Sequence, residues 1–208
     1  MKYWIYICLL LGYGCTEKQT SANNTNTPPL VTPPEDVTLA VNALLPQPHL
    51  PLLQQAVKWN DAGGQNWLLL YQSGPFAPSE GLQHAAIAAE LYIKTDSGFV
   101  RQWHYSDTVP ACTRGAGLQF YPDHLSVADV DANGYADITL VYQLQCAAPT
   151  QQQKKLVLYE RGRQYAWAGS DAANKPFPAS GSDTSALQPA VLQHVHNWWQ
   201  RFPAGDVP

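Results

Sequence analysis

The chain between residues 66 and 167 consists of short apolar runs and of segments that alternate apolar and polar side chains. A period of two is typical of β-strands that bury one face. The run Asn66–Gln72 predicts a strand, and Ser73-Gly74-Pro75 directly after it predicts that the strand stops there. The segment Ile87–Tyr105 is interrupted only by the turn sequence Thr95-Asp96-Ser97-Gly98, so it predicts a β-hairpin.

Further strands are expected on either side of a polar segment at residues 129–137. Leu125 and Val127 precede this segment, and apolar residues at every second position follow it, namely Ile138, Leu140, Tyr142 and Leu144. In the earlier hairpin the same spacing places Ile87, Ala89, Leu91 and Ile93 on one face. Lys155–Tyr159 and Arg163–Trp167 predict another hairpin, joined through Glu160-Arg161-Gly162.

Helical spacing is found near the C-terminus. Apolar residues recur there every three to four positions, at Leu187, Val191, Val195, Trp198 and Phe202. Ser185 is a candidate N-cap, and Pro189 suits the first turn. We therefore expect an amphipathic helix over residues 185–202 that packs this stripe on one face of a sheet.

The fold class that follows is mainly β, an antiparallel sheet or two packed sheets closed by one C-terminal amphipathic helix. Residues 171–183 are rich in Ala, Ser, Gly and Pro and are expected to form a loop. Residues 37–58 are ambiguous between helix and strand. No internal repeat predicts a propeller or a solenoid.

The N-terminus has the pattern of a secretory signal. Lys2 precedes an apolar run from Tyr3 to Leu11, which is shorter than the roughly 20 residues that span a bilayer. Gly14 directly before Cys15 resembles the processing site of bacterial lipoproteins, in which the cysteine is acylated and becomes the new N-terminus. Residues 1–14 are thus expected to be a lipoprotein-type signal peptide, with lipidation at Cys15. A plain cleaved signal and a retained N-terminal anchor are the alternatives.

Residues 15–36 are rich in Pro, Ser, Thr and Asn and hold almost no large apolar side chains. Such a segment cannot bury enough surface to order itself, so it predicts a disordered tether. Residues 37–208 then form a single β-rich domain with enough chain for a core. The expected location is the bacterial cell envelope, as an outer-membrane lipoprotein that faces the periplasm or the cell surface, with the membrane as partner through Cys15.

Two cysteines remain beyond the signal and its processing site, Cys112 and Cys146. In a secreted domain an even pair predicts a disulfide. Closing a loop of this length would stabilise the fold by about 3–4 kcal/mol in the chain-entropy model. A metal site built on the two cysteines is the alternative, although no histidine stands at zinc-finger spacing.

Charge is sparse. The net charge is −4, and it becomes −5 when Lys2 leaves with the signal; only 13% of residues are charged. Beyond Lys154-Lys155 there is no basic cluster, which argues against nucleic acid as a partner. The chain holds 11 Tyr and 7 Trp, which serve core packing and could also offer aromatic platforms to sugars.

The strongest chemical signal is the segment Asp129-Val-Asp-Ala-Asn-Gly-Tyr-Ala-Asp137. It places oxygen-bearing side chains at positions 1, 3, 5 and 9, a backbone carbonyl at position 7 and Gly134 at position 6. This order is the one by which a tight loop wraps Ca²⁺. The predicted ligands are Asp129, Asp131, Asn133, the Tyr135 carbonyl and Asp137. A polar hairpin turn is the alternative, because Asp, Asn and Gly are also common turn residues.

The flanks of this segment separate it from an EF-hand, which has helices on both sides and a glutamate at position 12, where this chain has Leu140. The loop resembles the calcium loops of FG-GAP and VCBS-type repeats, with the apolar Ile138 after the last aspartate. The chain holds a single copy, so the resemblance covers the loop and its strands. With water or a backbone oxygen completing the shell, an extracellular-type affinity of roughly 10⁻⁴–10⁻³ M or somewhat tighter is expected. The expected role of the Ca²⁺ is structural, because three carboxylates in one turn repel one another until a divalent ion neutralises them.

A wider resemblance covers about residues 60–170. It is carried by the motifs Gln65–Leu70, Val127–Gly134, Val141–Cys146, Lys155–Glu160 and Gln164–Ala166. These motifs resemble a family of uncharacterised bacterial envelope proteins that is loosely labelled as concerned with surface polysaccharide biosynthesis. The resemblance implies a cell-envelope setting, and it adds no catalytic residue because the family has no established mechanism.

Other candidate residues are weaker. No nucleophile-elbow, zinc-protease, dinucleotide or phosphate-loop motif is present. His194 and His196 are two apart, so on a helix they face different sides. Histidines 84, 104 and 124 could converge only through tertiary folding. Trp198-Trp199 is interpreted as core and rim packing, and Asp107 and Asp123 are candidates for supporting carboxylates.

Two functions are consistent with these patterns. The first is a non-enzymatic, lipid-anchored binding or assembly module with one structural Ca²⁺, for which a saccharide or an envelope protein is the expected partner. The second is a hydrolase or other enzyme that acts on envelope glycans. A pocket that groups two of the scattered His, Asp or Tyr side chains would favour the enzyme, and a flat aromatic surface would favour the binding module.

Overall fold

The computed structural model describes residues 31–42, 52–76, 83–112, 116–145, 153–170, 177–178 and 183–202. Ten strands within these residues form two five-stranded antiparallel sheets. The first sheet contains β1 Glu35–Asp36, β2 Leu52–Asp61, β3 Gly64–Phe76, β4 Gln83–Thr95 and β5 Gly98–Cys112. The second contains β10 Phe177–Pro178, β9 Arg163–Ser170, β8 Gln153–Glu160, β7 Asp137–Gln145 and β6 Gly117–Ala128, in that spatial order. The mainly β fold class is confirmed.

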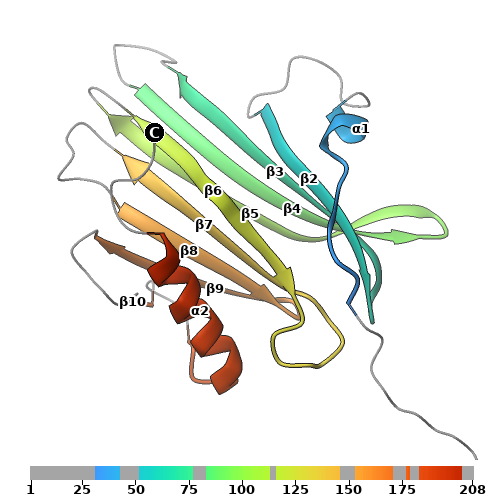
Figure 1. The fold of residues 1–208 in the computed structure, drawn as a ribbon. Helices are drawn as coiled ribbons and strands as arrows, with labels where there is room; N and C mark the ends of the chain where they lie inside the picture. Colours follow the sequence, from blue (N-terminus) through green and yellow to red (C-terminus); the bar gives the residue numbers. More distant parts are fainter. Residues whose placement is uncertain are drawn as a thin grey trace, which may run out of the picture.

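Tight turns join neighbouring strands at the positions that the sequence predicts. The β4–β5 hairpin turns at Thr95–Gly98, and it projects from the body of the molecule (Figure 1). The β8–β9 hairpin turns through Arg161 and Gly162, which have φ values of 45° and 82°. Because positive φ is common to the two-residue hairpin turns, a glycine there lowers the cost of the turn.

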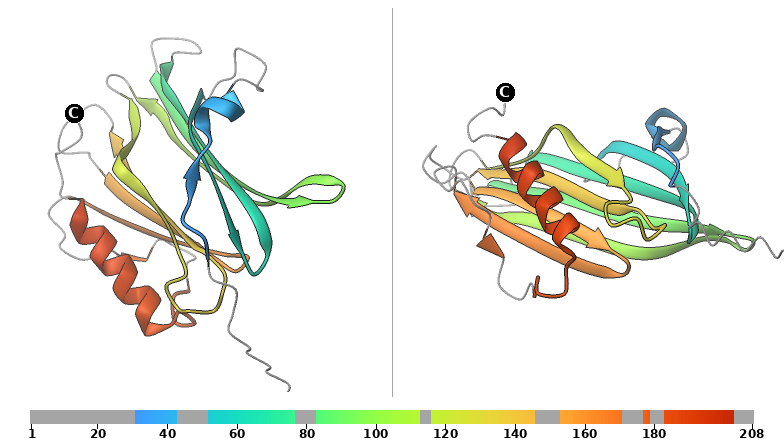
Figure 2. Two further views of the ribbon diagram at one scale, coloured as in Figure 1. Left: turned by 45° about the vertical axis from the view of Figure 1, so that its right-hand side comes forward. Right: turned by 60° about the horizontal axis from the view of Figure 1, so that its bottom comes forward.

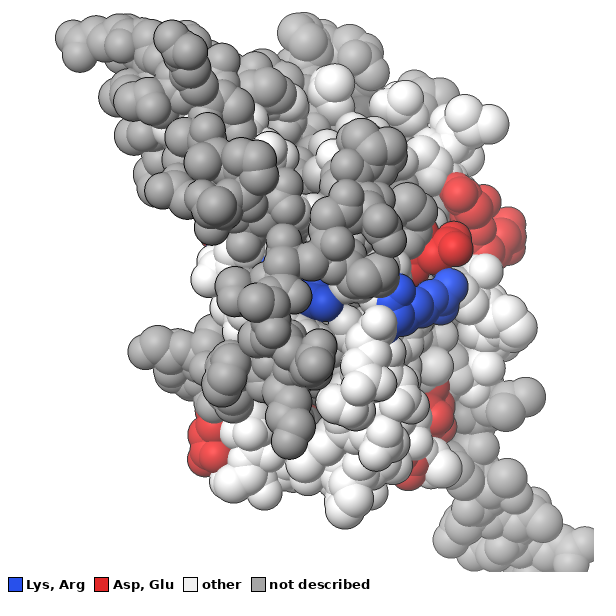
Figure 3. Space-filling view, turned by 60° about the vertical axis from the view of Figure 1, so that its left-hand side comes forward, with Lys and Arg blue, Asp and Glu red and all other residues white. Residues whose placement is uncertain are grey.

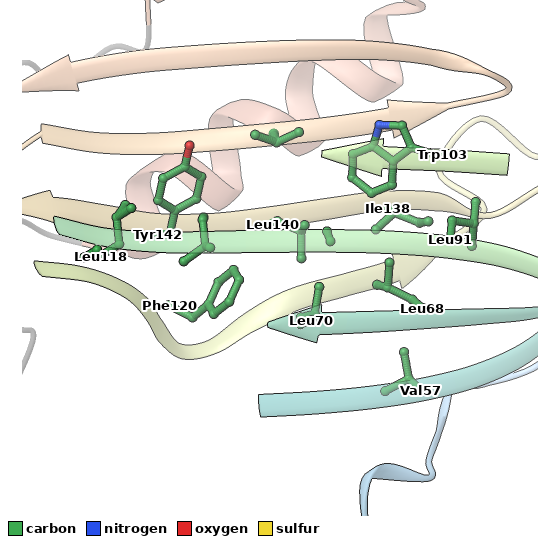
Figure 4. Close-up of a cluster of buried hydrophobic side chains, with 14 of the residues drawn as sticks. Val57, Leu68, Leu70, Leu91, Trp103, Leu118, Phe120, Ile138, Leu140 and Tyr142 are labelled. Atoms are coloured by element: carbon green, nitrogen blue, oxygen red, sulfur yellow. The ribbon is translucent and has the colours of Figure 1, made fainter. Parts of the chain in front are cut away.

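The two sheets face each other across the main hydrophobic core (Figure 4). Ile87, Ala89 and Leu91 contribute from the first sheet, and Leu140 and Tyr142 contribute from the second. These residues belong to the faces that the period-two pattern predicts, because successive strand residues point to opposite sides. The fold is therefore a sandwich of two meandering sheets.

The second sheet is buried on both faces. α2, Pro189–Arg201, lies across its outer face (Figures 1 and 2). Val191, Val195 and Trp199 of α2 pack there against Val141 of β7 and against residues of β8 and β9. Burial from both sides explains why β7 is buried from Asp137 through Gln143.

Two details of the predicted helix are wrong. α2 begins at Pro189, and its N-cap is Gln188 and not Ser185. The backbone N–H of Ser185 donates to the Asp183 side chain in a turn before the helix. Gln188 has an extended backbone because the ring of the following Pro189 disfavours the helical conformation at the residue before it. The buried tryptophan of the helix is Trp199, four residues after Val195, and Trp198 is half-buried at the rim.

The structure also departs from two sequence predictions about strands and resolves one segment that the sequence left ambiguous. β3 continues through Ser73-Gly74-Pro75 to Phe76, because the Ser73 side chain bonds to the backbone of Ala86 on β4 and bridges a break in register. The ambiguous segment 37–58 contains the short helix α1, Thr38–Asn42, and most of β2. The predicted loop 171–183 contains β10.

The N-terminal edge of the domain lies earlier than residue 37. Residues 31–36, which their composition assigned to the tether, run along β2 in the structure. Thr32 and Asn60 exchange hydrogen bonds, and β1 pairs with β2 at Lys58 and Val57. The predicted signal, Cys15 and the rest of the tether lie outside the described residues.

Candidate metal centre

The predicted calcium loop connects β6 to β7 at one end of the sandwich (Figure 1). The structure brings Asp129, Asp131 and Asp137 together, with one carboxylate oxygen of each within 4.8 Å of the others. Asp137 is buried, and the other two are half-buried. Among the described residues this is the one group of three or more His, Cys, Asp or Glu side chains at metal-ligand spacing.

Hydrogen bonds inside the loop hold these carboxylates in place. Asp129 accepts from the backbone N–H groups of Asn133 at 2.9 Å and Gly134 at 2.8 Å. Asp137 accepts from the N–H of Val130 at 2.9 Å, and the Asn133 side-chain oxygen accepts from the N–H of Tyr135 at 2.8 Å. A carboxylate oxygen has two lone pairs, so an oxygen that accepts one N–H can still bind a cation.

The backbone of the loop requires the glycine that the sequence supplies. Gly134 has φ 86° and is buried, so a side chain there would be strained. Ala132 also has positive φ, at 57°. The loop is therefore tightly wound, and its carboxylates point to one side of the turn.

The loop docks against the β2–β3 turn, which the sequence did not connect with it. The N–H of Ala62 donates to the Gly134 carbonyl at 2.8 Å, and Asp61 accepts from the N–H of Ala136 at 3.2 Å. The ring of Tyr135 lies against Gly63, and the guanidinium of Arg161 lies 5.4 Å from its centroid. Turns from both sheets thus hold the loop.

Asp131 faces the start of α2. Its Oδ2 accepts from the side-chain amide of Gln188 at 2.9 Å. Its Oδ1 is buried and has no hydrogen-bond partner among the described residues. Burying an anionic oxygen without a partner is costly, so this oxygen is suited to a cation.

Electrostatic repulsion is concentrated in the loop. Burial, together with the charges of Asp131, Glu160 and Asp129, raises the pKa of Asp137 to about 7, against the lowering effect of the Val130 N–H. The pKa of Glu160 is also raised, by burial and then by Asp131. A divalent cation would favour the ionised carboxylates and offset this repulsion.

Sequence reasoning missed Asp61, Glu160 and Gln188. They lie far from the loop in the chain, and no local motif marks them. For Asn133 and Tyr135 the structure shows the hydrogen bond between them, and their role as ligands stays a prediction.

The structure describes one of the two cysteines of the predicted disulfide. Cys112 is buried at the end of β5 and is disulfide-bonded. Cys146 lies outside the described residues, so the pairing of Cys112 with Cys146 stays a prediction.

The other candidate residues are dispersed. His104 lies 3.5 Å from Glu90, His124 contacts the Tyr121 carbonyl and His194 contacts Thr139. The two candidate supporting carboxylates are used elsewhere. Asp107 accepts from Tyr142 and Lys155, and Asp123 pairs with Arg201 at 3.6 Å. The side chain of His84 lies outside the described residues.

Comparison with protein-family models, with curated proteins and with solved structures found no match to this chain. Within the described residues no helix is both long and apolar enough to cross a membrane. Figure 3 shows one face of the molecule, on which Lys, Arg, Asp and Glu side chains are few among the described atoms.

Proposed function

We propose that this chain is a lipid-anchored protein of the bacterial cell envelope, a non-enzymatic binding or assembly module whose sandwich holds one structural Ca²⁺ at Asp129–Asp137. The observation that carries the metal site is the convergence of three carboxylates within 4.8 Å of one another. The N-terminal signal pattern with Cys15 and the polar tether after it support the anchor.

The donor set favours Ca²⁺ over other metals. Carboxylate, amide and carbonyl oxygens suit hard cations, whereas zinc and copper sites use His and Cys. A loop that winds around the ion and offers five protein oxygens suits the larger, more flexible shell of Ca²⁺. Mg²⁺ keeps several waters and demands near-ideal octahedral geometry.

A structural role follows from where the loop lies. Its backbone bonds to the β2–β3 turn, Tyr135 contacts Arg161 of the β8–β9 turn, and Asp131 bonds to Gln188 at the start of α2. An ion that fixes the loop would therefore also fix one end of both sheets and the entry to the helix. A catalytic ion would in addition need a coordination position that stays open to substrate or water.

The alternative, an enzyme acting on envelope glycans, has one supporting observation. Four side chains form a chain of hydrogen bonds, in the order Tyr105, Tyr142, Asp107 and Lys155. These groups satisfy each other between the two sheets, and Tyr142 is fully buried. The cluster is therefore better explained as a contact between sheets than as a site that meets substrate.

The test is a thermal melt of the purified full-length chain in EDTA and in 10 mM Ca²⁺ or Mg²⁺. With a dissociation constant of about 10⁻⁴–10⁻³ M, Ca²⁺ should add about 1.4–2.7 kcal/mol to the free energy of unfolding. For a chain of this size that corresponds to a rise in melting temperature of about 3–10 °C. The Asp131→Asn variant, which keeps an acceptor for Gln188 but loses a charge, should lose most of the rise.

The matched control is Asp96→Asn, an exposed aspartate in the β4–β5 turn. It should keep the full response to Ca²⁺. Equal shifts in all three proteins, or no shift in the wild type at 10 mM Ca²⁺, would reduce the loop to an ordinary polar turn.

A further inference from the structure

A hollow in the described part of the molecule lies where β1 and β2, at one edge of the first sheet, approach β6, an edge strand of the second. A cavity of about 810 Å³ there is lined by residues of β1, β2, β6 and α2. A second cavity, of about 410 Å³, continues along the same side. Both are lined by Asp36, Gln55 and His124, so they form one channel, named here the edge groove.

Irregularities in both strands open the edge groove. The pairing of β2 with β3 shifts register between Leu53 and Gln55. The pairing of β6 with β7 is interrupted between Phe120 and Leu125, where Asp123 has φ 52°. Bulges of this kind bend a strand and re-aim its side chains, and they are frequent next to binding sites.

Amide side chains line one half of the groove. Gln54, Gln55, Gln72 and Gln119 come from three strands of the two sheets. Gln72 accepts from the N–H of Phe120 at 3.4 Å, and no hydrogen bond occupies the other three side chains among the described residues. Each planar amide offers two donors and one acceptor oxygen, which matches adjacent hydroxyl groups that both donate and accept.

Aromatic rings stand at two places along the groove. The His124 ring stacks on Phe120 with centroids 4.6 Å apart. Trp198 lines the other half and is half-buried, with the Arg201 guanidinium 5.1 Å from its ring. Its ring also lies 5.9 Å from that of His194 and 5.6 Å from that of Phe202. The part of the indole that lines the groove can pack against the C–H face of a sugar, because both surfaces are flat and weakly polar.

The charged groups near the groove limit the ligand. Asp36 and Asp123 line it together with Arg201, and Arg201 and Asp123 pair at 3.6 Å. This pair leaves the single negative charge of Asp36, whose carboxylate accepts from the N–H of Thr38 at 2.8 Å. A strongly anionic ligand would therefore meet a net negative charge, and a strongly cationic ligand would have to compete for carboxylates that already have partners. An uncharged ligand rich in hydroxyl groups fits without that cost.

The alternative occupant is an extended peptide that adds a strand to one of the two edges. The β2 edge is already covered, because Val37 and Thr38 bond to Ala56. The β6 edge is broken by the bulge and by Pro122, which has no N–H to donate. Both features are protections against strand addition, so they favour the saccharide.

We propose that the edge groove binds an uncharged oligosaccharide, with Trp198 as the stacking platform and the glutamine cluster as the hydroxyl-reading surface. This inference rests on the proposed function as a binding module and names its ligand class. It uses a different region of the molecule from the calcium loop, so the two can fail independently.

The experiment is an NMR titration of the isotope-labelled full-length chain with maltohexaose, cellohexaose, chitohexaose and, separately, a hexapeptide of alternating Val and Thr. The NMR spectra would follow the indole N–H signals of the tryptophans and the side-chain amide signals of the glutamines. We expect at least one hexasaccharide to shift the Trp198 indole and the amides of Gln54 and Gln55. The peptide should leave them unchanged.

Two variants and one control locate the site. Trp198→Ala should weaken binding by roughly tenfold or more, since it removes a stacked ring. Gln54→Ala removes an exposed side chain that supports no described contact, and it should weaken binding by about two- to tenfold. The control is Gln102→Ala on β5, at the opposite edge of the first sheet, which should bind as the wild type does.

The outcomes separate this inference from the calcium site. If no hexasaccharide shifts the groove signals while Ca²⁺ still raises the melting temperature, the saccharide proposal is overturned and the metal proposal stands. Peptide binding in the groove, or saccharide binding that both variants leave intact, would overturn it as well. Saccharide binding without a Ca²⁺ response would leave the groove established and the metal site refuted.

Discussion

His124 is a half-buried side chain with one satisfied ring nitrogen. Its Nδ1 lies 2.7 Å from the Tyr121 carbonyl and so carries the proton, whereas Nε2 is buried with no partner among the described residues. Protonation would place a second N–H where nothing accepts it. Burial accordingly lowers the pKa of His124 below its ordinary value of 6.5, despite opposing effects of the Tyr121 carbonyl and Asp123.

This environment predicts a pH dependence of stability. Below pH 6.5 the unfolded chain takes up a proton at position 124 before the folded chain does, so the free energy of unfolding falls as the pH falls toward the lowered pKa. The slope contributed by one such group is at most about 1.4 kcal/mol per pH unit. Urea denaturation at pH 8, 7, 6 and 5 should show a shallower decline for His124→Asn, in which the amide can still donate to Tyr121.

The interval from pH 8 to 7 is the internal control, because the unfolded histidine, with a pKa of about 6.5, takes up only about a fifth of a proton there and the folded one takes up less. His194, whose pKa is also lowered by burial, remains in both proteins and cancels in the comparison. If the free energies of unfolding of the wild type and of His124→Asn fall in parallel from pH 8 to 5, the pH dependence does not come from His124.

At the scale of the element, α2 is held at both ends by hydrogen bonds to the second sheet and to the loop between β6 and β7. Gln188 at its start bonds to Asp131 of the metal loop. At its end, Lys154 of β8, which is 5% exposed, donates to the carbonyls of Trp199 at 2.8 Å and Phe202 at 2.6 Å. The last carbonyls of a helix lack partners within the helix and carry the negative end of its dipole, so a buried ammonium is well placed there.

Lys154→Met should release this end of the helix. Two buried carbonyls would lose charge-assisted hydrogen bonds, and we expect a loss of about 2–3 kcal/mol in the free energy of unfolding. Hydrogen exchange should quicken in the last turn of α2 before it quickens in β7. Lys94→Met, at an exposed position near the β4–β5 turn, is the matched control and should change stability little. A loss no larger than that of the control would show that apolar packing alone holds the helix.

At the scale of the whole molecule, polar contacts join the two sheets beside the apolar core. Asp107 of β5 accepts from Tyr142 of β7 at 2.5 Å and from Lys155 of β8 at 2.6 Å. Nearby, Trp103 of β5 donates to Gln164 of β9 at 2.9 Å and stacks on Tyr159. The edge strand of the first sheet is thereby fastened to three strands of the second, on the side away from the edge groove.

Asp107→Asn should weaken this connection. The amide cannot match the carboxylate as a partner for both Tyr142 and Lys155, and we expect a loss of about 1–3 kcal/mol. Lys155 is 25% exposed on its side chain, so water can replace part of the lost contact and keeps the effect moderate. Urea denaturation beside the exposed control Asp96→Asn measures it. Equal stability of the two variants would mean that the apolar core alone joins the sheets.

Period-two and helical patterns were sufficient to predict the fold class, two of the hairpins and the C-terminal helix. They worked because strand faces and helix stripes are decided locally, by which side chains must avoid water. They failed at β10 and at the extension of β3, where pairing with a neighbouring strand overrides weak local propensity. The prediction that Trp198 belongs to the buried stripe failed because α2 buries every fourth residue, Val191, Val195 and Trp199. Which residues of the helix are buried depends on how the helix lies on the sheet, and the helix sequence alone does not decide that.

The convergence of the three carboxylates of residues 129–137 could be predicted from the chain, because the carboxylates, an amide and a glycine lie within nine residues and such a turn folds on itself. What holds the loop could not be read, since Asp61 and Gln188 are brought to it by contacts between distant segments. The edge groove has no sequence signal at all. It exists because bulges in two strands, far apart in the chain, open at the same side of the sandwich, and only the packing of the two sheets places them opposite each other.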